Sequence, residues 1–444
     1  MKSPHTSRRT FLKASAVAGS ALLLDPARFA HAAGSDEIKL ALVGCGGRGT
    51  GAVANAFDAS GGPTRLVAMA DLVEAKLNSS YLTLSSYGAQ VDVPPDRRFL
   101  GFDAYRHAID CLPPGGVVML TTHAAFRATH LEYAIAKGVN VFMEKSFASD
   151  PAGIRRILQL GELAGKKNLK IATGLMCRHS ASREALIQKI RAGEIGDVEL
   201  IRAYRLQNGQ RMAPFEHKEN ELLWQIRHPH YVLWVGTGVF IDNVIHQIDE
   251  CCWIKDSWPV SAHGMGGRAP DNTDCSQNLD TYSVEYTFAD GTKALVNGRF
   301  APKCHADFAT FIHGSKCAAQ FSGNVHAPTV QIFKDQHTRN DNVTWKPDKE
   351  SVSPYVAEWS ALLHAIRGDQ PHNEVRRSAL SNLAALMGRA AVHGGKLITW
   401  EEMLASNFAF CPDVGALNET SPAPVQADTA GRYPAPSPST WKEV

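Results

Sequence analysis

The 444-residue sequence has little of what marks a nucleic-acid-binding or zinc-binding protein. It contains no block of basic residues and no stripe of aromatic and basic residues, and its formal net charge is only +2. Nucleic acid is therefore not an expected partner. The nine cysteines are scattered without a Cys-x-x-Cys pair, so we expect no metal site. We expect most of these cysteines to be small residues of the core.

Long apolar runs are also scarce. One such run lies near the start, from Ala14 to Leu24, and no second long run follows it. It is too short to span a bilayer as a mature helix. It follows Ser7-Arg8-Arg9-Thr10-Phe11-Leu12-Lys13 and precedes Ala30-His31-Ala32, the layout of a secretory leader over residues 1–32 that is removed after Ala32. The paired arginines indicate the twin-arginine export machinery. An Arg pair in a general secretory leader or in a retained anchor is the alternative.

The leader predicts a location and a partner for the mature chain. We expect a periplasmic protein that is exported folded by the twin-arginine machinery and has no membrane association after processing. The mature chain, roughly 410 residues long, exceeds one ordinary core and indicates two domains.

The amino-terminal half alternates buried strands with helices. Its apolar runs are continuous rather than alternating, as in parallel strands that are covered on both faces. The expected strands are Leu40–Val43, Arg65–Asp71, Val117–Leu120, Val139–Met143 and Leu169–Thr173. Leu131 to Lys137 is helical and ends at Gly138. This order predicts an α/β fold with a Rossmann-type, doubly wound parallel sheet.

A glycine-rich loop, Gly44-Cys45-Gly46-Gly47-Arg48-Gly49, follows the first strand. Gly44 permits a tight turn, Gly46 lets backbone approach a pyrophosphate, and Gly49 lets the helix pack closely on the strand. The helix beginning there offers free N–H groups to the diphosphate. Asp71 ends the second strand, where a carboxylate binds ribose hydroxyls and repels a 2′-phosphate. We therefore predict NAD as the cofactor; a glycine-rich turn that binds nothing is the alternative.

The carboxy-terminal half has a different pattern. Tyr282 to Phe288 alternates strictly, and Ala289-Asp290-Gly291 forms a turn. Further expected strands are Val198–Tyr204, Val260–Gly264, Ala294–Phe300 and Val330–Phe333. We predict an α+β domain with a large, open-faced, mainly antiparallel sheet. Helices can cover one apolar face of such a sheet, and its open face is a natural wall for a substrate cleft or a subunit interface.

Two helices follow this sheet in the sequence. Trp359, Leu362, Leu363 and Ile366 recur at helical spacing, as do Leu383, Met387 and Ala390. The predicted boundaries are a leader over 1–32, an NAD-binding domain over 33–175, a substrate and oligomerisation domain over 176–410, and an extended Pro-rich tail over 411–444.

The sequence resembles the Gfo/Idh/MocA family of sugar and cyclitol oxidoreductases over nearly all of the mature chain. The residues that carry the resemblance are Gly44–Gly49, Thr121-Thr122-His123 through His130, Glu144-Lys145-Ser146, Gly174 with Arg178, Ile195-Gly196-Asp197, Gly236–Asp249, and Met387-Gly388-Arg389 through Leu404. Ser146 stands where the family usually has Pro, and Val244 where it often has Gly.

The resemblance implies that Lys145 and His246 face the nicotinamide and the reacting hydroxyl. It also implies that another subunit covers the open sheet face, so we expect a homo-oligomer of dimer or tetramer size. Asp242 is expected as a third catalytic residue. Asp242 lies one helical turn before His246, where it either orients the imidazole or binds a sugar hydroxyl. The expected cofactor-binding residues are Gly44, Gly46, Gly47, Arg48, Gly49, Asp71, Thr121, Thr122, His123, Glu144 and Lys145. The alternative is that the Glu144-Lys145 pair lies on a solvated surface and that the Asp242–His246 pair has only a structural role.

Substrate binding is expected from Arg178, His230 and Tyr231. The last two belong to Arg227-His228-Pro229-His230-Tyr231, for which a substrate-lining loop and a plain surface loop are both open readings. The resulting hypothesis is an exported NAD-dependent oxidoreductase with tightly bound cofactor that acts on a secondary hydroxyl of a sugar, glycoside or cyclitol. One alternative is a redox-neutral NAD-dependent glycosidase or lyase with His230 or Tyr231 as an added base. Another is a non-enzymatic sugar-binding or scaffold protein.

Overall fold

Two β-sheets, one parallel and one mixed, organise the chain from Ile38 to Val444, which clusters as one compact unit. The structure is a computed structural model that describes residues 36–209, 211–323 and 329–444. The predicted leader, residues 1–32, lies outside the described residues.

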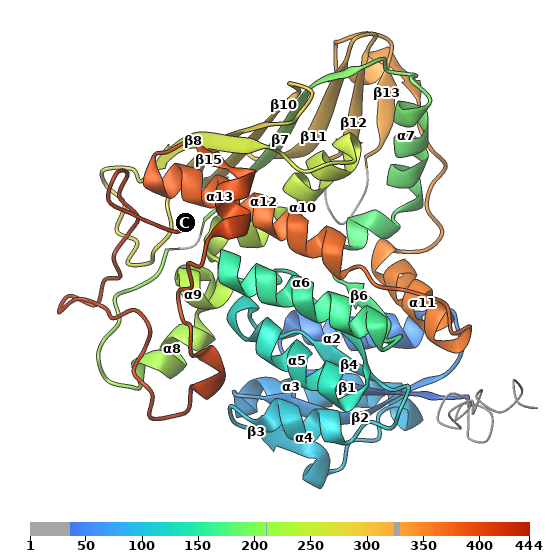
Figure 1. The fold of residues 1–444 in the computed structure, drawn as a ribbon, viewed down its shortest axis with the longest axis vertical. Coiled ribbons are helices and arrows are strands. Elements are labelled where there is room, and N and C mark those ends of the chain that lie inside the picture. The colour runs from blue at the N-terminus through green and yellow to red at the C-terminus, as the bar shows by residue number, and fades with distance from the viewer. Residues whose placement is uncertain (1–35, 210, 324–328) are drawn as a thin grey trace, which may run out of the picture. The chain divides into compact units, whose positions relative to one another are not determined.

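The parallel sheet has the strand order β3-β2-β1-β4-β5-β6 (Figure 1). Its strands are β1 (Ile38–Val43), β2 (Thr64–Asp71), β3 (Arg98–Leu100), β4 (Val117–Leu120), β5 (Asn140–Met143) and β6 (Ile171–Thr173). This is the order of a Rossmann-type doubly wound sheet and confirms the predicted fold class. The central strands β1, β4 and β5 are buried almost throughout, as helices on both faces require.

Helices cover both faces of the parallel sheet. One face packs on α2 (Gly47–Asp58), α3 (Glu74–Leu84) and α11 (Pro354–Arg367), and the other on α4 (Ala104–Asp110), α5 (Arg127–Lys137) and α6 (Pro151–Lys166). Helix α5 ends at Gly138, whose φ is +72°. Helix α11 comes from far along the chain, and its Trp359 stacks on Phe142 of β5 with ring centroids 4.5 Å apart. The carboxy-terminal part of the chain therefore returns to the first sheet.

The second sheet has nine strands in the order β14-β13-β12-β11-β7-β10-β9-β8-β15. They are β7 (Val198–Gln207), β8 (Ser261–Gly267), β9 (Thr281–Thr287), β10 (Lys293–Phe300), β11 (Asp307–Gly314), β12 (Ala318–Ser322), β13 (Gln331–Phe333), β14 (Val343–Trp345) and β15 (Ile398–Thr399). All neighbours pair antiparallel except β7 and β10, which pair in parallel. The sheet is mainly antiparallel, as expected, with one parallel pair.

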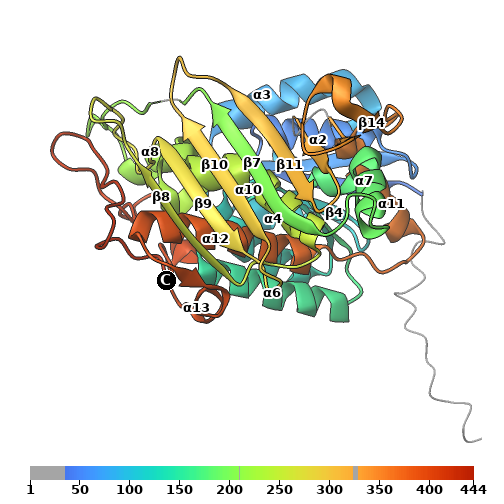
Figure 2. The same cartoon turned by 90° about the horizontal axis from the view of Figure 1, so that it is seen from above.

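Two long helices, α10 (Gly238–Lys255) and α12 (Val375–Gly394), lie against one face of the second sheet (Figures 1 and 2). Tyr282, Val284 and Tyr286 of β9 point into this core and alternate with less buried residues. Helix α12 ends at Gly395, whose φ is +63°. The remaining helices are α7 (Ala181–Arg191), α8 (Glu221–Arg227), α9 (Leu233–Gly236) and α13 (Trp400–Ala405).

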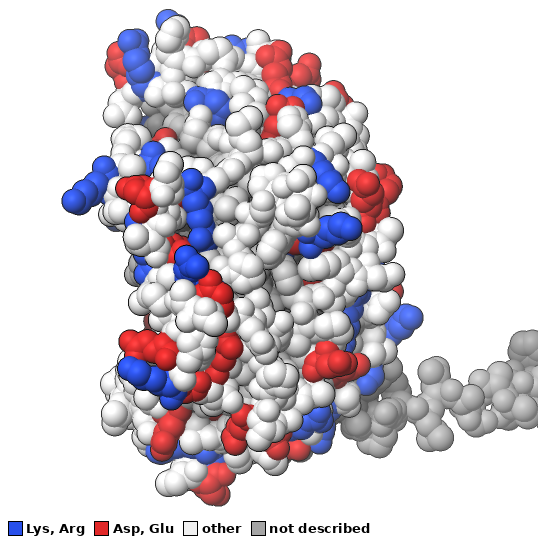
Figure 3. Space-filling view, turned by 90° about the vertical axis from the view of Figure 1, so that its left-hand side faces the viewer, with Lys and Arg blue, Asp and Glu red and all other residues white. Residues whose placement is uncertain are grey.

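The last residues, from about 406 onwards, follow the body of the unit with one short helical turn at Val414–Ala416. Tyr433 and Glu443 are buried, so this segment packs on the rest of the unit. The molecular face turned to the left in Figure 1 carries acidic and basic side chains interspersed among uncharged ones (Figure 3). Within the described ranges, no helix is long and apolar enough to cross a membrane.

Candidate active site

Two adjoining cavities open at the carboxyl ends of β1, β2 and β4. We call the first the nucleoside pocket; Gly44, Asp71, Phe102 and Ile226 are among its lining residues. The second, the central cavity, has a volume of about 500 Å³ and is lined by the glycine loop, by Lys145 and by residues of α10. The two cavities share Gly46, Lys76, Thr121, Thr122 and His123. Their arrangement suits a ligand with two linked halves.

The glycine loop has the shape that a dinucleotide needs. Gly44 has φ of +100°, and a Cβ there would lie 2.7 Å from the Thr121 carbonyl carbon. A Cβ on Gly49 would lie 2.1 Å from the Gly44 oxygen, whereas a Cβ on Gly46 or Gly47 would meet nothing within 4 Å. The first and last glycines are thus required by packing, and the middle two leave backbone open to the cavity. The residues present fit a pyrophosphate at the start of α2.

Asp71 lies at the end of β2 and lines the nucleoside pocket. Its carboxylate accepts the backbone N–H of Cys45 at 2.6 Å and that of Val73 at 2.8 Å. Asp71 therefore fixes the glycine loop as well as presenting negative charge to the pocket. Lys76, on the following helix, lines the same pocket and was not expected from the sequence.

The segment after β4 forms the wall between the two cavities. The Thr121 hydroxyl donates to the carbonyls of Val43 and Gly44, and the Thr122 hydroxyl contacts His130 Nδ1 at 3.1 Å. Burial and nearby positive charge lower the pKa of His123 to about 3, so this imidazole is neutral at pH 7. These side chains shape the wall and bring no net charge to it.

Arg48 and Glu144 form an ion pair across the central cavity. Arg48 Nε lies 2.7 Å from Glu144 Oε1, and the guanidinium stacks over the Tyr355 ring at 4.7 Å. A Cβ on Gly174 would lie 2.5 Å from Glu144 Oε2, so glycine is needed there to make room for the carboxylate. The Glu144 side chain is thus held against the glycine loop, which places Lys145 in the cavity.

Three titratable side chains meet in the central cavity. Lys145 Nζ donates to Asp242 Oδ1 at 2.9 Å and to the Asp242 carbonyl at 2.6 Å, and His230 Nδ1 lies 3.2 Å from Asp242 Oδ2. Burial alone would raise the pKa of Asp242, but Lys145 and His230 together lower it well below its usual range. The hydrogen bond with Asp242 raises the pKa of His230. The Asp242 carboxylate therefore holds the side chains of Lys145 and His230 in position.

His246 lines the same cavity one turn further along α10. Burial, followed by the charges of Lys145 and Arg205, lowers its pKa well below 6.5, so the imidazole is neutral at pH 7. Its Nδ1 has no hydrogen-bond partner among the described residues. The Asp242 carboxylate contacts Lys145 and His230 rather than this ring, so of the two roles expected for Asp242 the binding of a sugar hydroxyl stays a prediction.

Arg205 and Asn243 also line the central cavity and were missed from the sequence. Arg205 lies on β7, and its guanidinium stacks over Phe308 at 3.9 Å. A basic residue in an alternating strand is usually solvent-exposed, so only the tertiary structure identifies it as a cavity residue.

Two predicted substrate-binding residues lie elsewhere. Arg178 forms a bidentate ion pair with Asp249, with N–O distances of 2.8 and 2.9 Å, and does not line the central cavity. Tyr231 lines a separate pocket with Trp224 and His228. Of the predicted substrate residues, only His230 lies with Lys145 and Asp242. The sequence does not indicate the ion pair of Arg178, because Asp249 lies 71 residues away.

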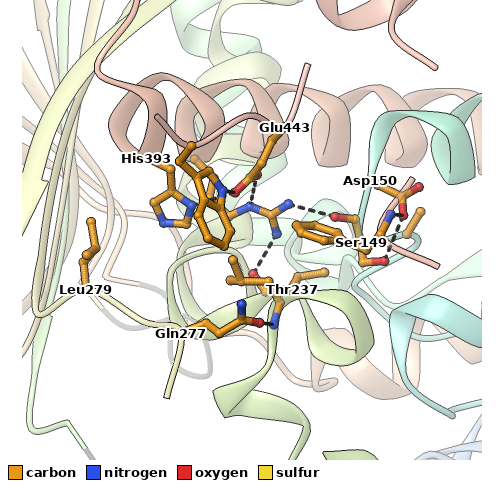
Figure 4. Close-up of polar contacts among 12 residues, drawn as sticks. Ser149, Asp150, Thr237, Gln277, Leu279, His393 and Glu443 are labelled. Carbon is orange, nitrogen blue, oxygen red and sulfur yellow. Dashed lines mark hydrogen bonds and ion pairs between the residues drawn. The ribbon is translucent and has the colours of Figure 1, made fainter. Parts of the chain in front are cut away.

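A buried arginine connects the two segments that carry these groups (Figure 4). Arg389 donates to the carbonyl of Ser149 at 2.8 Å and to that of Thr237 at 2.9 Å, and its Nε lies 2.7 Å from Glu443. Ser149 follows Lys145 by four residues, and Thr237 directly precedes α10. We call Arg389, His393 and Glu443 the arginine centre, in which His393 Nδ1 lies 2.7 Å from Glu443.

The cysteines and other possible metal ligands show a simple pattern. All nine cysteines are free thiols, and six of them are buried. No group of three or more His, Cys, Asp or Glu side chains in the part of the chain that the structure describes is placed to hold a metal.

Residues 184–320 match the family model of the GFO/IDH/MocA C-terminal domain. This match supports the Gfo/Idh/MocA family for the chain. The rhizopine catabolism protein MocA of Rhizobium meliloti is 21% identical over 291 residues, which cover 64% of this chain and 78% of that protein.

Two solved structures share the fold. One is scyllo-inositol dehydrogenase from Lactobacillus casei with bound NAD(H) and scyllo-inositol, at 20% identity and a TM-score of 0.60, covering 83% of this chain and all of that one. The other is aldose-aldose oxidoreductase from Caulobacter crescentus complexed with glycerol, at 16% identity and a TM-score of 0.62, covering 82% of this chain and 99% of that one. Both likenesses agree with a Rossmann-type sheet joined to a second, mixed sheet.

Proposed function

We propose that this protein is an exported NAD-dependent oxidoreductase with tightly bound cofactor that acts on a secondary hydroxyl of a sugar, glycoside or cyclitol. One observation carries the proposal: Lys145, Asp242 and His246 line the same cavity as the open backbone of Gly46 and Gly47. The names of the relatives, which include a dehydrogenase and an oxidoreductase, support the same reaction class.

The residues of the central cavity have different roles in the proposed oxidation of a secondary alcohol. Bound NAD supplies the hydride acceptor. The Lys145 ammonium, held by Asp242, donates a hydrogen bond to the substrate oxygen, and the neutral His246 accepts the hydroxyl proton. Arg205 and Asn243 offer further donors to neighbouring hydroxyls. Lys145 and Asp242 are half-buried, which strengthens these electrostatic contacts.

A second candidate is a redox-neutral glycosidase or lyase that oxidises a ring hydroxyl only transiently. The position of His230 favours it, because this route needs a further acid or base beside the reacting ring and His230 lies 3.2 Å from Asp242 in the central cavity. Such a reaction also suits a periplasm without a diffusible nicotinamide pool.

One experiment tests both candidates. The purified protein is denatured and its released nucleotide is identified by mass; the intact protein is then incubated with a panel of free sugars, cyclitols and glycosides. Net NADH with an oxidised product supports the dehydrogenase, and aglycone release without net NADH supports the second candidate. A protein that releases no nucleotide and binds none in titration would contradict both.

A further inference from the structure

The wall of the nucleoside pocket is completed by a residue from outside the parallel sheet. Leu72, Phe102 and Phe126 line the pocket from the loops that follow β2, β3 and β4, and Ile226 lines it from α8. The same four residues belong to an apolar cluster with Trp234 and Val235 of α9 and, from the last residues, Phe410 and Val425. A segment of the second half of the chain therefore packs over the pocket.

Helix α8 is held in place by a buried glutamine. Gln225 is fully buried, accepts the indole N–H of Trp234 at 2.6 Å and donates to the Val425 carbonyl at 2.6 Å. A buried amide that satisfies both its acceptor and its donor fixes the three segments that it joins. One side chain thus connects α8, α9 and the carboxy-terminal segment directly beside Ile226.

The carboxy-terminal segment makes further polar contacts with α8. Glu221 Oε1 accepts the Ala427 N–H at 2.7 Å and the Tyr433 hydroxyl at 2.8 Å, and Asn220 donates to the Glu419 carbonyl at 3.0 Å. The His123 ring in the pocket wall also forms a hydrogen bond with the backbone of Ile226. Moving α8 away from the pocket would break all of these bonds together.

We propose that residues 221–236 and 410–433, here called the strap, close over the adenosine half of bound NAD and make its release slow, with Ile226 as the residue that contacts the nucleoside. This inference rests on the NAD binding proposed above. The ligand class follows from the pocket, which joins apolar walls to the carboxylate of Asp71 and to the open glycine loop. Slow release keeps the nucleotide with the protein through dilution, since differences in affinity arise mainly in dissociation rates.

The test measures exchange of bound labelled NAD against excess unlabelled NAD in the whole protein, without any substrate. We expect Ile226→Ala to speed exchange at least tenfold. Gln225→Met, which frees the strap without changing the pocket wall, is expected to speed it at least threefold. Ile187→Ala is the matched control, because Ile187 is equally buried on α7 and lines neither cavity; its exchange rate should stay within twofold of wild type.

The strap proposal would be refuted if Ile226→Ala exchanged NAD at the wild-type rate or no faster than Ile187→Ala. The proposal of NAD binding would not be affected by that result. Rapid exchange by the wild type would refute the strap proposal as well. If Ile226→Ala does not fold, Ile226→Val is used, with a smaller increase expected in the same direction. Failure of the wild type to bind NAD at all would instead refute the proposed function and the strap with it.

Discussion

Lys145 and Asp242 come from opposite halves of the sequence and meet in one cavity. Replacing Lys145 with Met removes the ammonium that lies 2.9 Å from Asp242 Oδ1 and that we propose donates to the substrate oxygen. We expect kcat to fall by about 10²–10⁴-fold, the usual contribution of a positioned acid or base, with NAD binding retained. The measurement is steady-state turnover together with nucleotide titration.

A matched control for this variant is Lys170→Met. Lys170 is also a lysine in an ion pair, with Asp369 at 2.6 Å, and it is buried but lies outside both cavities. Its kcat is expected to stay within threefold of wild type. Equal losses of turnover in the two variants would show that Lys145 contributes only to stability.

We propose that Asp71 determines the choice between NAD and NADP. Its carboxylate repels a 2′-phosphate, so NADP should bind at least tenfold more weakly than NAD, about 1.4 kcal/mol. Asp71→Ala should narrow this gap, mainly by weakening NAD, because the Cys45 and Val73 N–H groups then lose their acceptor. Isothermal titration with both nucleotides measures the gap. Tighter binding of NADP by the wild type would contradict this assignment, and Lys76 would be the first residue to replace.

The sequence predicted site residues where one local pattern determines their position. The glycine loop and Asp71 sit at fixed distances from a strand end, and the structure places them in the two cavities. Side chains whose role depends on a distant partner were not predictable. Arg178 carries the same charge whether it binds substrate or Asp249, and Arg205 has no local mark that distinguishes it from a surface residue.

At the level of elements, the arginine centre connects the segment that follows Lys145 with the start of α10. Burial would raise the pKa of Glu443, but Arg389 and His393 lower it to about 2. Glu443→Gln removes this charge and leaves Arg389 buried without its anion. Breaking a buried pair typically costs about 3–5 kcal/mol, and we expect a loss of this size in the free energy of unfolding at pH 7, measured by urea denaturation.

The loss should also depend on pH. Because the pKa of Glu443 is lower in the folded than in the unfolded state, its contribution is complete above the ordinary glutamate pKa of about 4.3 and disappears as pH falls towards about 2. Wild type and Glu443→Gln should therefore converge in acid. Glu401→Gln, an exposed control, should change stability by less than about 0.5 kcal/mol at either pH. A difference that does not vary with pH would argue against the ion pair as its cause.

Elements were predictable where the apolar pattern was regular. The continuous runs predicted five of the six strands of the parallel sheet, and β4 has the expected bounds. The short edge strand β3 was missed, because its three residues contain no apolar run. Strands β11 and β12 were missed because Asp307–Gly314 and Ala318–Ser322 lack strict alternation, and their neighbours in the sheet determine their conformation. The return of α11 to the first sheet was also missed, since helical spacing does not indicate which sheet a helix covers.

For the whole molecule, we propose a homo-oligomer of dimer or tetramer size. Helices α10 and α12 cover one face of the second sheet, and the other face is open in the unit described (Figure 2). That face carries Leu295 and Phe311 partly exposed next to charged neighbours. Light scattering at micromolar concentration should give a mass of two or four chains, whereas a monomer at that concentration would refute the proposal.

The arginine centre also has a consequence for biosynthesis. Domains usually fold during synthesis in order from the amino terminus, but Arg389 cannot gain its carboxylate partner until Glu443 has been translated. The junction between Lys145 and α10 is therefore completed only after nearly all of this sequence has left the ribosome. A chain that ends shortly before Glu443 would contain the residues of both sheets but an incomplete arginine centre. In such a chain the Arg389 guanidinium would lack its anionic partner.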